Sequence, residues 1–206
     1  MAKKILLLGA TGKMGLALEE ALKKDYLLIC KNSQDFEAEN FAQVQALIKE
    51  VNPDILINTV ALLGIDPCES QPEKAFCLNT LYPKVLAEAA KEMGFLLAHF
   101  STDAVFSDKK EGFCTEEESP RPVNIYGLTK FGGDCFIQAI APKFYIIRIS
   151  VLFGQANKNG HFVEKMLQRI KEGQKLLRIS DDIILSPTYS GDVAVEVKRI
   201  IESEAP

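Results

Sequence analysis

The sequence predicts an α/β fold: a doubly wound parallel sheet with a small C-terminal α/β appendage. Short, wholly apolar runs alternate along the chain with longer segments in which apolar residues recur at helical spacing. This alternation is typical of parallel strands that are buried on both faces and connected by helices. After Gly154 the pattern loosens, so we expect residues 1–153 to form the main domain and residues 154–206 a reduced lobe that does not fold independently.

The expected elements follow one another in the order that such a sheet requires. The expected strands are residues 3–8, 26–30, 55–58, 95–100 and 144–149. The expected helices are a first one through Leu16 to Leu22, then 41–50, 72–93, one that carries Tyr126 and ends near Pro142, 161–172, and a last one from Ser190. A loop containing Gly64, Asp66 and Pro67 precedes the long helix, residues 107–122 form an acidic surface flap, and residues 176–185 form a short strand pair.

Composition limits the class of protein. The chain has 206 residues, 47% of them hydrophobic and 25% charged, which suits one well-packed globular core. Its net charge of −4 argues against binding to nucleic acid by neutralising phosphates. No apolar run is long enough to span a membrane, and the N-terminus lacks the pattern of a signal peptide. We therefore expect a cytoplasmic protein that does not associate with membranes.

Cysteine and histidine usage argues against a metal site and against a disulfide framework. The five cysteines are odd in number and widely spaced, and no C-x-x-C motif occurs. With only two histidines, His99 and His161, a histidine-based metal site is not expected. The cysteines are predicted to be reduced thiols, and His99, inside an apolar strand, is predicted to be a core histidine.

A glycine-rich turn separates the first strand from the first helix. Gly9, Gly12 and Gly15 follow the apolar run directly, and strand, glycine turn and helix together form the context of a Rossmann-type dinucleotide site. There the backbone approaches a pyrophosphate at the helix N-terminus. An ATP-binding P-loop is excluded because Met14 stands where that motif requires Ser or Thr. The alternative is a glycine turn that binds no ligand.

The end of the second strand bears on the choice between NAD and NADP. An NAD site usually places an acidic residue there, which binds the ribose 2′-hydroxyl. Here Lys31 follows the strand, and a lysine at this place can neutralise a 2′-phosphate. We therefore expect NADP(H) in preference to NAD(H), with Asp35 near the adenine edge.

Hydroxyl groups and a lysine are expected to meet at the carboxyl end of the fourth strand. Ser101-Thr102-Asp103 follows that strand, at the edge where open parallel sheets bind ligands. Tyr126 and Lys130 are four residues apart, so a helix places them on one face, where the ammonium lowers the pKa of the phenol. The plain alternatives are a Ser/Thr/Asp turn and a surface Tyr beside a solvated Lys.

The order of these features resembles the extended short-chain dehydrogenase/reductase superfamily, and within it the dTDP-4-dehydrorhamnose reductase family. The likeness runs from about Ile5 to Ala194. The segments that carry it are the glycine loop, Gly64-Ile65-Asp66 with Cys68-Glu69 and Pro72, Ser101 to Phe106, Thr115-Glu116-Glu117, Pro122 to Gly127, and Leu185 to Tyr189 with Asp192 and Ala194. No segment is decisive by itself, but their joint order is hard to obtain by chance.

The resemblance implies an NADP(H)-dependent reductase of a 4-keto sugar nucleotide. Tyr126 would be the general acid that protonates the carbonyl oxygen, Thr102 would bind the same oxygen, and Lys130 would bind the nicotinamide ribose and tune Tyr126. Independently, negative charge that develops on an oxygen requires donors placed in advance. The cofactor would be held by Gly9, Thr11, Gly12, Lys13, Met14, Gly15, Lys31, Asp35, Val60, Ala61 and Asn79, besides Tyr126 and Lys130.

Departures from the family pattern keep other functions open. Ala104 stands where the family usually has Tyr, and Leu62-Leu63 replaces a more polar segment. Family members usually continue beyond residue 206, so a shortened C-terminal part is expected. The alternatives are a non-catalytic NAD(P)-binding regulatory subunit and a sugar-nucleotide epimerase, whereas Ala104-Val105 disfavour a dehydratase. A possible homo-oligomer is suggested only by how common such assemblies are.

Overall fold

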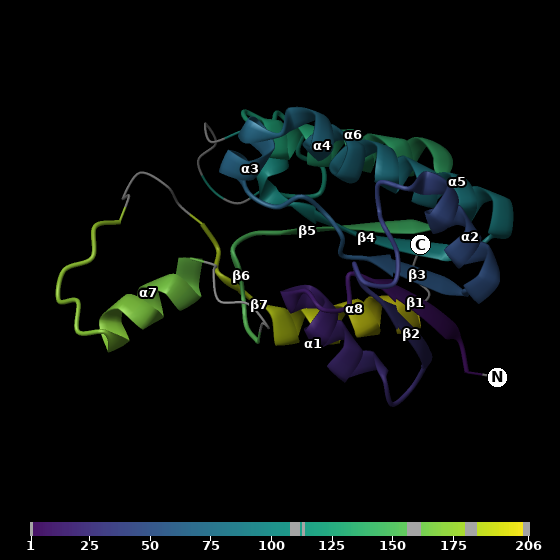
Figure 1. Cartoon of the computed structure of the whole chain (residues 1–206), viewed down its shortest axis with the longest axis horizontal. Helices are drawn as coiled ribbons and strands as arrows, with labels where there is room; N and C mark the ends of the chain where they lie inside the picture. The colour runs from purple at the N-terminus through teal and green to yellow at the C-terminus, as the bar shows by residue number, and fades with distance from the viewer. Residues whose placement is uncertain (1, 108–111, 113, 156–161, 180–184, 204–206) are drawn as a thin grey trace.

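A five-stranded parallel sheet forms the centre of the molecule, with the strand order β2-β1-β3-β4-β5 (Figure 1). The computed structural model describes residues 2–107, 112, 114–155, 162–179 and 185–203. The strands are β1 (Lys4–Leu8), β2 (Leu27–Lys31), β3 (Ile55–Asn58), β4 (Leu96–Thr102) and β5 (Phe144–Ile149). The predicted doubly wound sheet is confirmed, and every expected strand of the main domain lies within two residues of its predicted bounds.

Helices cover both faces of the sheet, which explains why its strands are wholly apolar. Leu6 and Leu8 of β1 pack on one face, and Ile5 and Leu7 on the other. The first face is covered by α2 (Phe41–Val51), α5 (Tyr82–Met93) and α6 (Ile125–Ile140), and the second by α1 (Lys13–Leu22) and α8 (Ser190–Ser203). Figure 1 shows these two layers above and below the sheet. Alternate residues of each strand therefore enter separate hydrophobic clusters.

The direction of the chain reverses at the centre of the sheet. From β1 the chain passes to β2 on one side, whereas β3, β4 and β5 follow on the other side. This is a topological switch point, where the connections after neighbouring strands leave in opposite directions and open a crevice at the carboxyl edge. The glycine turn that follows β1 lies at this switch point.

The connection between β3 and β4 is more helical than the sequence predicted. The expected loop contains a short helix, α3 (Ile65–Ser70). Pro67 is compatible with this helix because it lies in the first turn, where the backbone N–H makes no intrahelical hydrogen bond. The expected single helix 72–93 is divided into α4 (Pro72–Phe76), a π-helical turn η1 (Cys77–Leu81) and α5. Within η1 the Thr80 hydroxyl donates to the backbone oxygen of Thr129 on α6, at 2.6 Å. This contact joins the interrupted turn to α6.

The C-terminal segment differs from the sequence prediction in its strands. The predicted strand pair at 176–185 is wrong for the part described, since residues 174–179 and 185–187 form no strand and 180–184 lie outside the described residues. A parallel pair forms instead between β6 (Leu152–Phe153) and β7 (Thr188–Tyr189), where the rings of Phe153 and Tyr189 pack 5.5 Å apart. The last helix, α8, packs into the core cluster that contains α1. The boundary at residue 153 stays a prediction.

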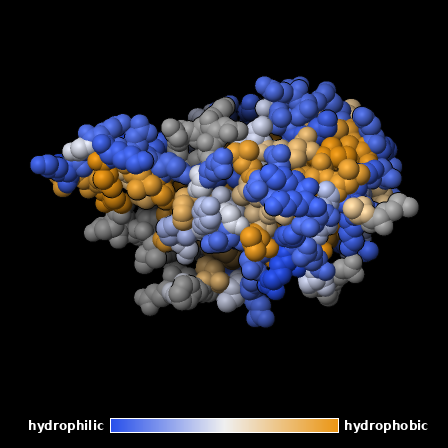
Figure 2. Space-filling model, turned by 90° about the horizontal axis from the view of Figure 1, so that it is seen from below, coloured by the Kyte–Doolittle hydropathy of each residue, from blue (hydrophilic) through white to orange (hydrophobic). Residues whose placement is uncertain are grey.

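Helix α7 (Phe162–Lys171) projects away from the sheet (Figure 1). None of its residues is buried, and Phe162, Leu167 and Ile170 are each at least half exposed. Figure 2 shows apolar side chains gathered on the projecting lobe that carries this helix. The lobe therefore presents an apolar surface that the described chain leaves uncovered.

Candidate active site

The conformation of the glycine loop depends on close contacts that leave no room for a side chain at Gly9 or Gly15. Gly9 has φ +85°, and a Cβ at this position would lie 2.4 Å from the hydroxyl oxygen of Thr59. A Cβ at Gly15 would lie 2.3 Å from the backbone oxygen of Gly9, so only glycine lets α1 approach the turn this closely. Thr11 lies in the turn and Gly12 is the N-cap of α1. The helix N-terminus is thereby brought to the switch point of the sheet.

The side chains of Lys13 and Met14 turn away from this loop. The Lys13 ammonium donates to the Glu164 carboxylate on α7 at 2.6 Å and to the backbone oxygen of Leu152 at 3.0 Å. Met14 is buried in the cluster beneath α1 and α8. Any contact of these two residues with a pyrophosphate in this arrangement is therefore a backbone contact, and their predicted role in cofactor binding stays a prediction.

Lys31 and Asp35 lie beside the glycine loop. The backbone oxygen of Lys31 accepts hydrogen bonds from the amides of Gly9 and Ala10, at 2.9 and 3.1 Å. The ammonium of Lys31 lies 3.8 Å from the Asp35 carboxylate, and both side chains are about one-third exposed. The structure thus brings both predicted ribose-side residues to the loop, with their charges paired weakly across solvent.

Asn79 fixes the segment that follows β3. Its carboxamide accepts from the amide of Leu62 at 2.8 Å, and donates to the oxygen of Leu62 at 3.0 Å and to the Thr129 hydroxyl at 3.2 Å. Val60 and Ala61 lie between this anchor and Asn58, whose side-chain oxygen accepts from the amide of Val60 at 3.1 Å. Asn79 therefore holds the wall of the predicted cofactor trough in place, and its direct contact with a cofactor stays a prediction.

The hydroxyls of Thr102 and Tyr126 meet at the carboxyl end of β4. Helix α6 starts there because the Asn124 side chain caps it, accepting from the amide of Gly127 at 2.8 Å. Thr102 is buried, and its hydroxyl oxygen accepts from the amide of Ala104 at 3.1 Å in the short 3₁₀ turn η2 (Asp103–Val105). The Thr102 hydroxyl donates to the Asp103 carboxylate at 3.1 Å, and the Thr102 side chain also interacts with the Tyr126 phenol, whose pKa it lowers. Two hydroxyls thus converge at the sheet edge where a ligand is expected.

The pKa of Tyr126 is shifted in the direction opposite to the sequence prediction. The pKa of this phenol is raised to about 12: burial raises it most, the interaction with Thr102 opposes the rise, and Asp103 and Cys68 add to it. The expectation that Lys130 lowers this pKa is wrong for this structure, because the lysine points elsewhere. Its Nζ donates to the backbone oxygen of Phe100 at 2.6 Å.

Behind Lys130 lies a group of buried polar side chains. His99 is fully buried, as predicted for a core histidine, and its Nε2 lies 3.1 Å from Lys130 Nζ. Asp134, one turn further along α6, is also fully buried and accepts from the Ser101 hydroxyl at 3.0 Å and from Arg148 at 3.2 Å. Burial raises the pKa of Asp134, and Ser101, Lys130 and Arg148 oppose this. Sequence reasoning assigned Asp134 no role, although its spacing of four from Lys130 was a usable signal.

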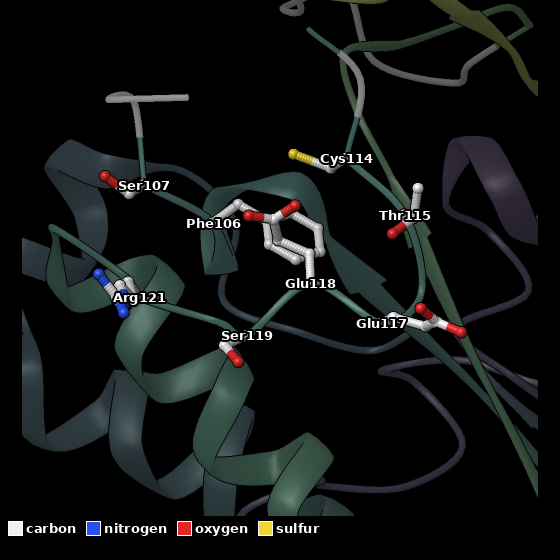
Figure 3. Close-up of a pocket in the computed structure, with 8 residues that line it drawn as sticks. All are labelled: Phe106, Ser107, Cys114, Thr115, Glu117, Glu118, Ser119 and Arg121. Carbon is white, nitrogen blue, oxygen red and sulfur yellow. The ribbon is translucent and has the colours of Figure 1, made fainter. Parts of the chain in front are cut away.

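A cavity of about 590 Å³ lies in the segment between β4 and α6 (Figure 3). Its lining residues are Phe106, Ser107, Cys114, Thr115, Glu117, Glu118, Ser119 and Arg121. The guanidinium of Arg148 lies over the Phe106 ring, 5.2 Å from its centroid, so the wall of the cavity contacts the buried group around Asp134. The lining contains two glutamates and one arginine, and this charge balance does not by itself favour binding of a diphosphate.

Other kinds of site have no support within the described residues. No group of three or more His, Cys, Asp or Glu side chains is placed there to hold a metal ion. All five cysteines are free thiols in the structure. No helix among the described residues is long and apolar enough to cross a membrane.

Comparison with known proteins identifies the family. Residues 3–206 match the family described as RmlD substrate binding domain. The chain belongs to this RmlD family. The dTDP-4-dehydrorhamnose reductase of Aggregatibacter actinomycetemcomitans is 31% identical over 201 residues, which cover 97% of this chain and 67% of the relative. The resemblance to dTDP-4-dehydrorhamnose reductases that the motifs indicated is thereby confirmed.

Solved structures of RmlD-family relatives share the fold. A dTDP-4-dehydrorhamnose reductase from Clostridium acetobutylicum is 33% identical, with a TM-score of 0.91 over 97% of this chain and 70% of its own. One from Bacillus anthracis, in complex with NADP, is 29% identical, with a TM-score of 0.89 over 98% of this chain and 72% of its own. The chain spans 60–67% of the length of the first five curated relatives that it matches.

Proposed function

We propose that this chain is an NADP(H)-dependent reductase of a 4-keto sugar nucleotide. The observation that carries the proposal is the meeting of the Thr102 and Tyr126 hydroxyls at the same sheet edge as the glycine loop. A carbonyl oxygen that lies against both hydroxyls would accept two hydrogen bonds, as developing negative charge requires.

Each hydroxyl has a distinct role in this proposal. NADPH, when bound, supplies the hydride. Tyr126 donates its phenolic proton to the carbonyl oxygen, and Thr102 holds that oxygen in place. Because the pKa of Tyr126 is about 12, the phenol is protonated at neutral pH, as a general acid must be before the reaction. Lys130 binds the nicotinamide ribose.

The loop around Gly9 and Gly15 fits a dinucleotide pyrophosphate. Side chains are excluded there by the backbone, which leaves the N-terminus of α1 accessible to an anion. Lys31 beside the loop favours the 2′-phosphate of NADP(H) over NAD(H). The Bacillus anthracis relative, which is in complex with NADP, supports the same preference.

The setting of the enzyme follows from its relatives. Several of them are dTDP-4-dehydrorhamnose reductases, so the substrate in this proposal is a small nucleotide sugar. Binding to nucleic acid or to a membrane is not part of the proposal. We place the protein in the cytoplasm, with homo-oligomerisation as a further expectation.

The test is oxidation of NADPH in the presence of a dTDP-4-keto-6-deoxy sugar. Tyr126→Phe removes one oxygen and should lower kcat by about 10²- to 10⁴-fold, while NADPH binding is retained. Tyr82→Phe is the matched control, because it removes a phenolic oxygen from α5 that lies outside the site. It should keep wild-type kcat.

One outcome of this assay would contradict the proposal. If wild type consumes NADPH no faster than Tyr126→Phe, the chain does not reduce this substrate. Tight NADPH binding together with that result would favour the regulatory subunit.

A further inference from the structure

A continuous row of hydrogen bonds links β3 to the reacting face of α6. The side-chain oxygen of Asn58 accepts from the amide of Val60 at 3.1 Å, and Asn58 Nδ2 lies 3.0 Å from His99 Nδ1. His99 Nε2 lies 3.1 Å from Lys130 Nζ, which donates to the oxygen of Phe100 at 2.6 Å. The register of β3 and β4 pairs Asn58 with His99, and all three side chains are at most 2% exposed.

The first contact fixes the orientation of the Asn58 amide. The backbone N–H of Val60 is a donor, so the group that faces it must be the acceptor oxygen of the carboxamide. The Nδ2 group, which can only donate, therefore faces His99 Nδ1. In a neutral imidazole one nitrogen accepts and the other carries the proton. Asn58 thus places the His99 proton on Nε2.

The Nε2–H group of His99 points at Lys130. His99 is neutral, because burial alone lowers its pKa well below the usual value, and a charged Lys130 would lower it further. An ammonium has three donors and no acceptor, so it would set an N–H against the imidazole N–H. A neutral amine has one lone pair, which can accept from Nε2–H while one of its own N–H groups donates to Phe100. Only the neutral amine satisfies every contact in the row.

We propose that Asn58 and His99 are positioning residues that hold Lys130 as a neutral amine, by fixing the imidazole in its Nε2–H tautomer. Neither residue was assigned a functional role by sequence reasoning. Their effect on a substrate or cofactor acts through Lys130.

Turning the Asn58 amide does not remove the constraint. The oxygen would then face His99 Nδ1 and free Nε2 to accept from an ammonium, but Nδ2 would face the amide of Val60. Either orientation leaves one pair of opposed donors when Lys130 is charged. An unmatched buried donor costs about 1–3 kcal/mol. Protonation of Lys130 is therefore coupled to breaking one contact of the row.

Among the other charged groups around Lys130, Asp134 raises the pKa of the lysine, but by less than burial lowers it. Asp134, on the next turn of α6, favours the ammonium, and Arg148 of β5 neutralises part of that carboxylate from the other side. Tyr126 lies one turn earlier on α6 and is protonated at neutral pH. Burial outweighs Asp134 and lowers the pKa of Lys130 to about 8. The neutral amine therefore predominates above about pH 8, and the loss or gain of a single hydrogen bond shifts that boundary.

The consequence for catalysis rests on the proposed reductase function, whereas the order of hydrogen bonds does not. In a reductase of this kind the Lys130 ammonium becomes available to Tyr126 and the ribose only when it is released from His99. Proton uptake at Lys130 would thus accompany ligand binding.

Imidazole nitrogen NMR tests the row directly. The chain has two histidines, so a two-bond ¹H–¹⁵N spectrum of the full chain at pH 9 shows two rings, and His161→Gln assigns the second. His99 should show a pyridine-like Nδ1 and a pyrrole-like Nε2. Asn58→Asp keeps an acceptor for the Val60 amide but places an acceptor against Nδ1, so the two shifts should exchange.

A pyrrole-like Nδ1 in the wild-type protein would overturn the proposal, and so would an Asn58→Asp spectrum identical to wild type. If that variant does not fold, the wild-type spectrum alone decides. In the NADPH assay Asn58→Asp should also move the pH midpoint of kcat/KM upward by at least one unit, on the order expected for a nearby charge. The tautomer requires no cofactor or substrate, so a chain without reductase activity would sink the proposed function and leave the tautomer result standing.

Discussion

The geometry of the two candidate ligand regions at the carboxyl edge of the sheet is set by the backbone in one region and by side chains in the other. At β1 and α1 the geometry is set by the backbone, because Gly9 and Gly15 leave no room for a Cβ. At β4 and α6 it is set by buried side chains, chiefly His99, Lys130 and Asp134. We infer that the first region is sensitive to added volume, and that the second is sensitive to changes of charge and of hydrogen-bond direction.

The largest expected effect comes from adding volume at the backbone-built region. Gly15→Val places its Cβ 2.3 Å from the Gly9 oxygen, so the backbone must move. We expect a loss of about 3 kcal/mol in the free energy of unfolding and loss of measurable NADPH binding. Chemical denaturation and fluorescence titration with NADPH measure the two effects.

Gly12→Ala separates folding from binding at the same loop. Gly12 has φ −73° and its Cβ would lie 3.3 Å from the Gly9 oxygen, so alanine requires only a small adjustment. Stability should fall by about 0.5–1 kcal/mol because alanine is a poorer N-cap than glycine, while NADPH affinity falls much more because the new methyl group stands in the path of the pyrophosphate. Unchanged affinity in this variant would show that the loop does not bind phosphate.

The next effect concerns the side-chain-built region, whose stability should depend on pH. The pKa of Lys130 is about 8 in the folded protein against 10.5 when unperturbed, so between these values the unfolded chain binds the extra proton. The contribution of Lys130 to stability is therefore present above pH 10.5 and is lost as pH falls towards 8. Relative to Lys130→Met, the wild-type free energy of unfolding should rise by roughly 1 kcal/mol per pH unit across this window.

Denaturation of both proteins at pH 8, 9 and 10 gives the two slopes. Equal slopes would mean that the pKa of Lys130 is not lowered in the folded protein. The side-chain-built region would then not differ from the backbone-built region in its pH dependence.

A fourth prediction concerns Lys31, a side chain beside the backbone-built region. Lys31 is the charged group beside the loop that we assign to the 2′-phosphate, and its pairing with Asp35 at 3.8 Å is loose. Lys31→Ala should lower the ratio of NADPH to NADH affinity by about tenfold, or roughly 1.4 kcal/mol, with folding unaffected. Asp35→Ala serves as the counterpart and should not lower that ratio. An unchanged ratio in Lys31→Ala would assign the selectivity to another residue.

The smallest expected effect concerns the stability contribution of one buried hydroxyl on the α5–α6 side of the sheet. Tyr82 is fully buried, and its hydroxyl has no hydrogen-bond partner among the described residues. Burial raises the pKa of this phenol. Tyr82→Phe should therefore stabilise the fold by about 0.5–1 kcal/mol, because it removes an unpaired polar group. A lower thermal midpoint would reveal a partner for this hydroxyl.

The backbone-built region could be predicted from sequence because glycine spacing carries its geometry. Gly9, Gly12 and Gly15 between an apolar run and a helical pattern were sufficient to locate the loop. The bounds of β3 and β5 matched for a similar reason, since short apolar runs ended at polar residues or prolines. The breaks within 72–93 were missed because the π turn depends on contacts with α6, such as Thr80 to Thr129.

The side-chain-built region could be predicted only in part. The spacing of Tyr126 and Lys130 placed them on one helix face, but no spacing rule shows that Lys130 turns to Phe100 and His99. The pairing of Asn58 with His99 depends on the register of two strands far apart in sequence. The pKa of Tyr126 was predicted in the wrong direction because burial, which outweighs the nearby charges, cannot be read from spacing.

The ion pair between Lys13 and Glu164 links the side of the proposed phosphate site to the projecting lobe. It ties the first turn of α1 to α7, and the Glu164 carboxylate also accepts from the amide of Gly154 at 3.3 Å. The Lys13 side chain could reach an anion at the loop only by leaving Glu164, which would remove this tie between α1 and α7. By thermodynamic reciprocity, any interaction that holds α7 in place lowers the affinity for that anion by the same factor. In the proposed reductase, Glu164 on the projecting lobe and the phosphate would then compete for the same ammonium.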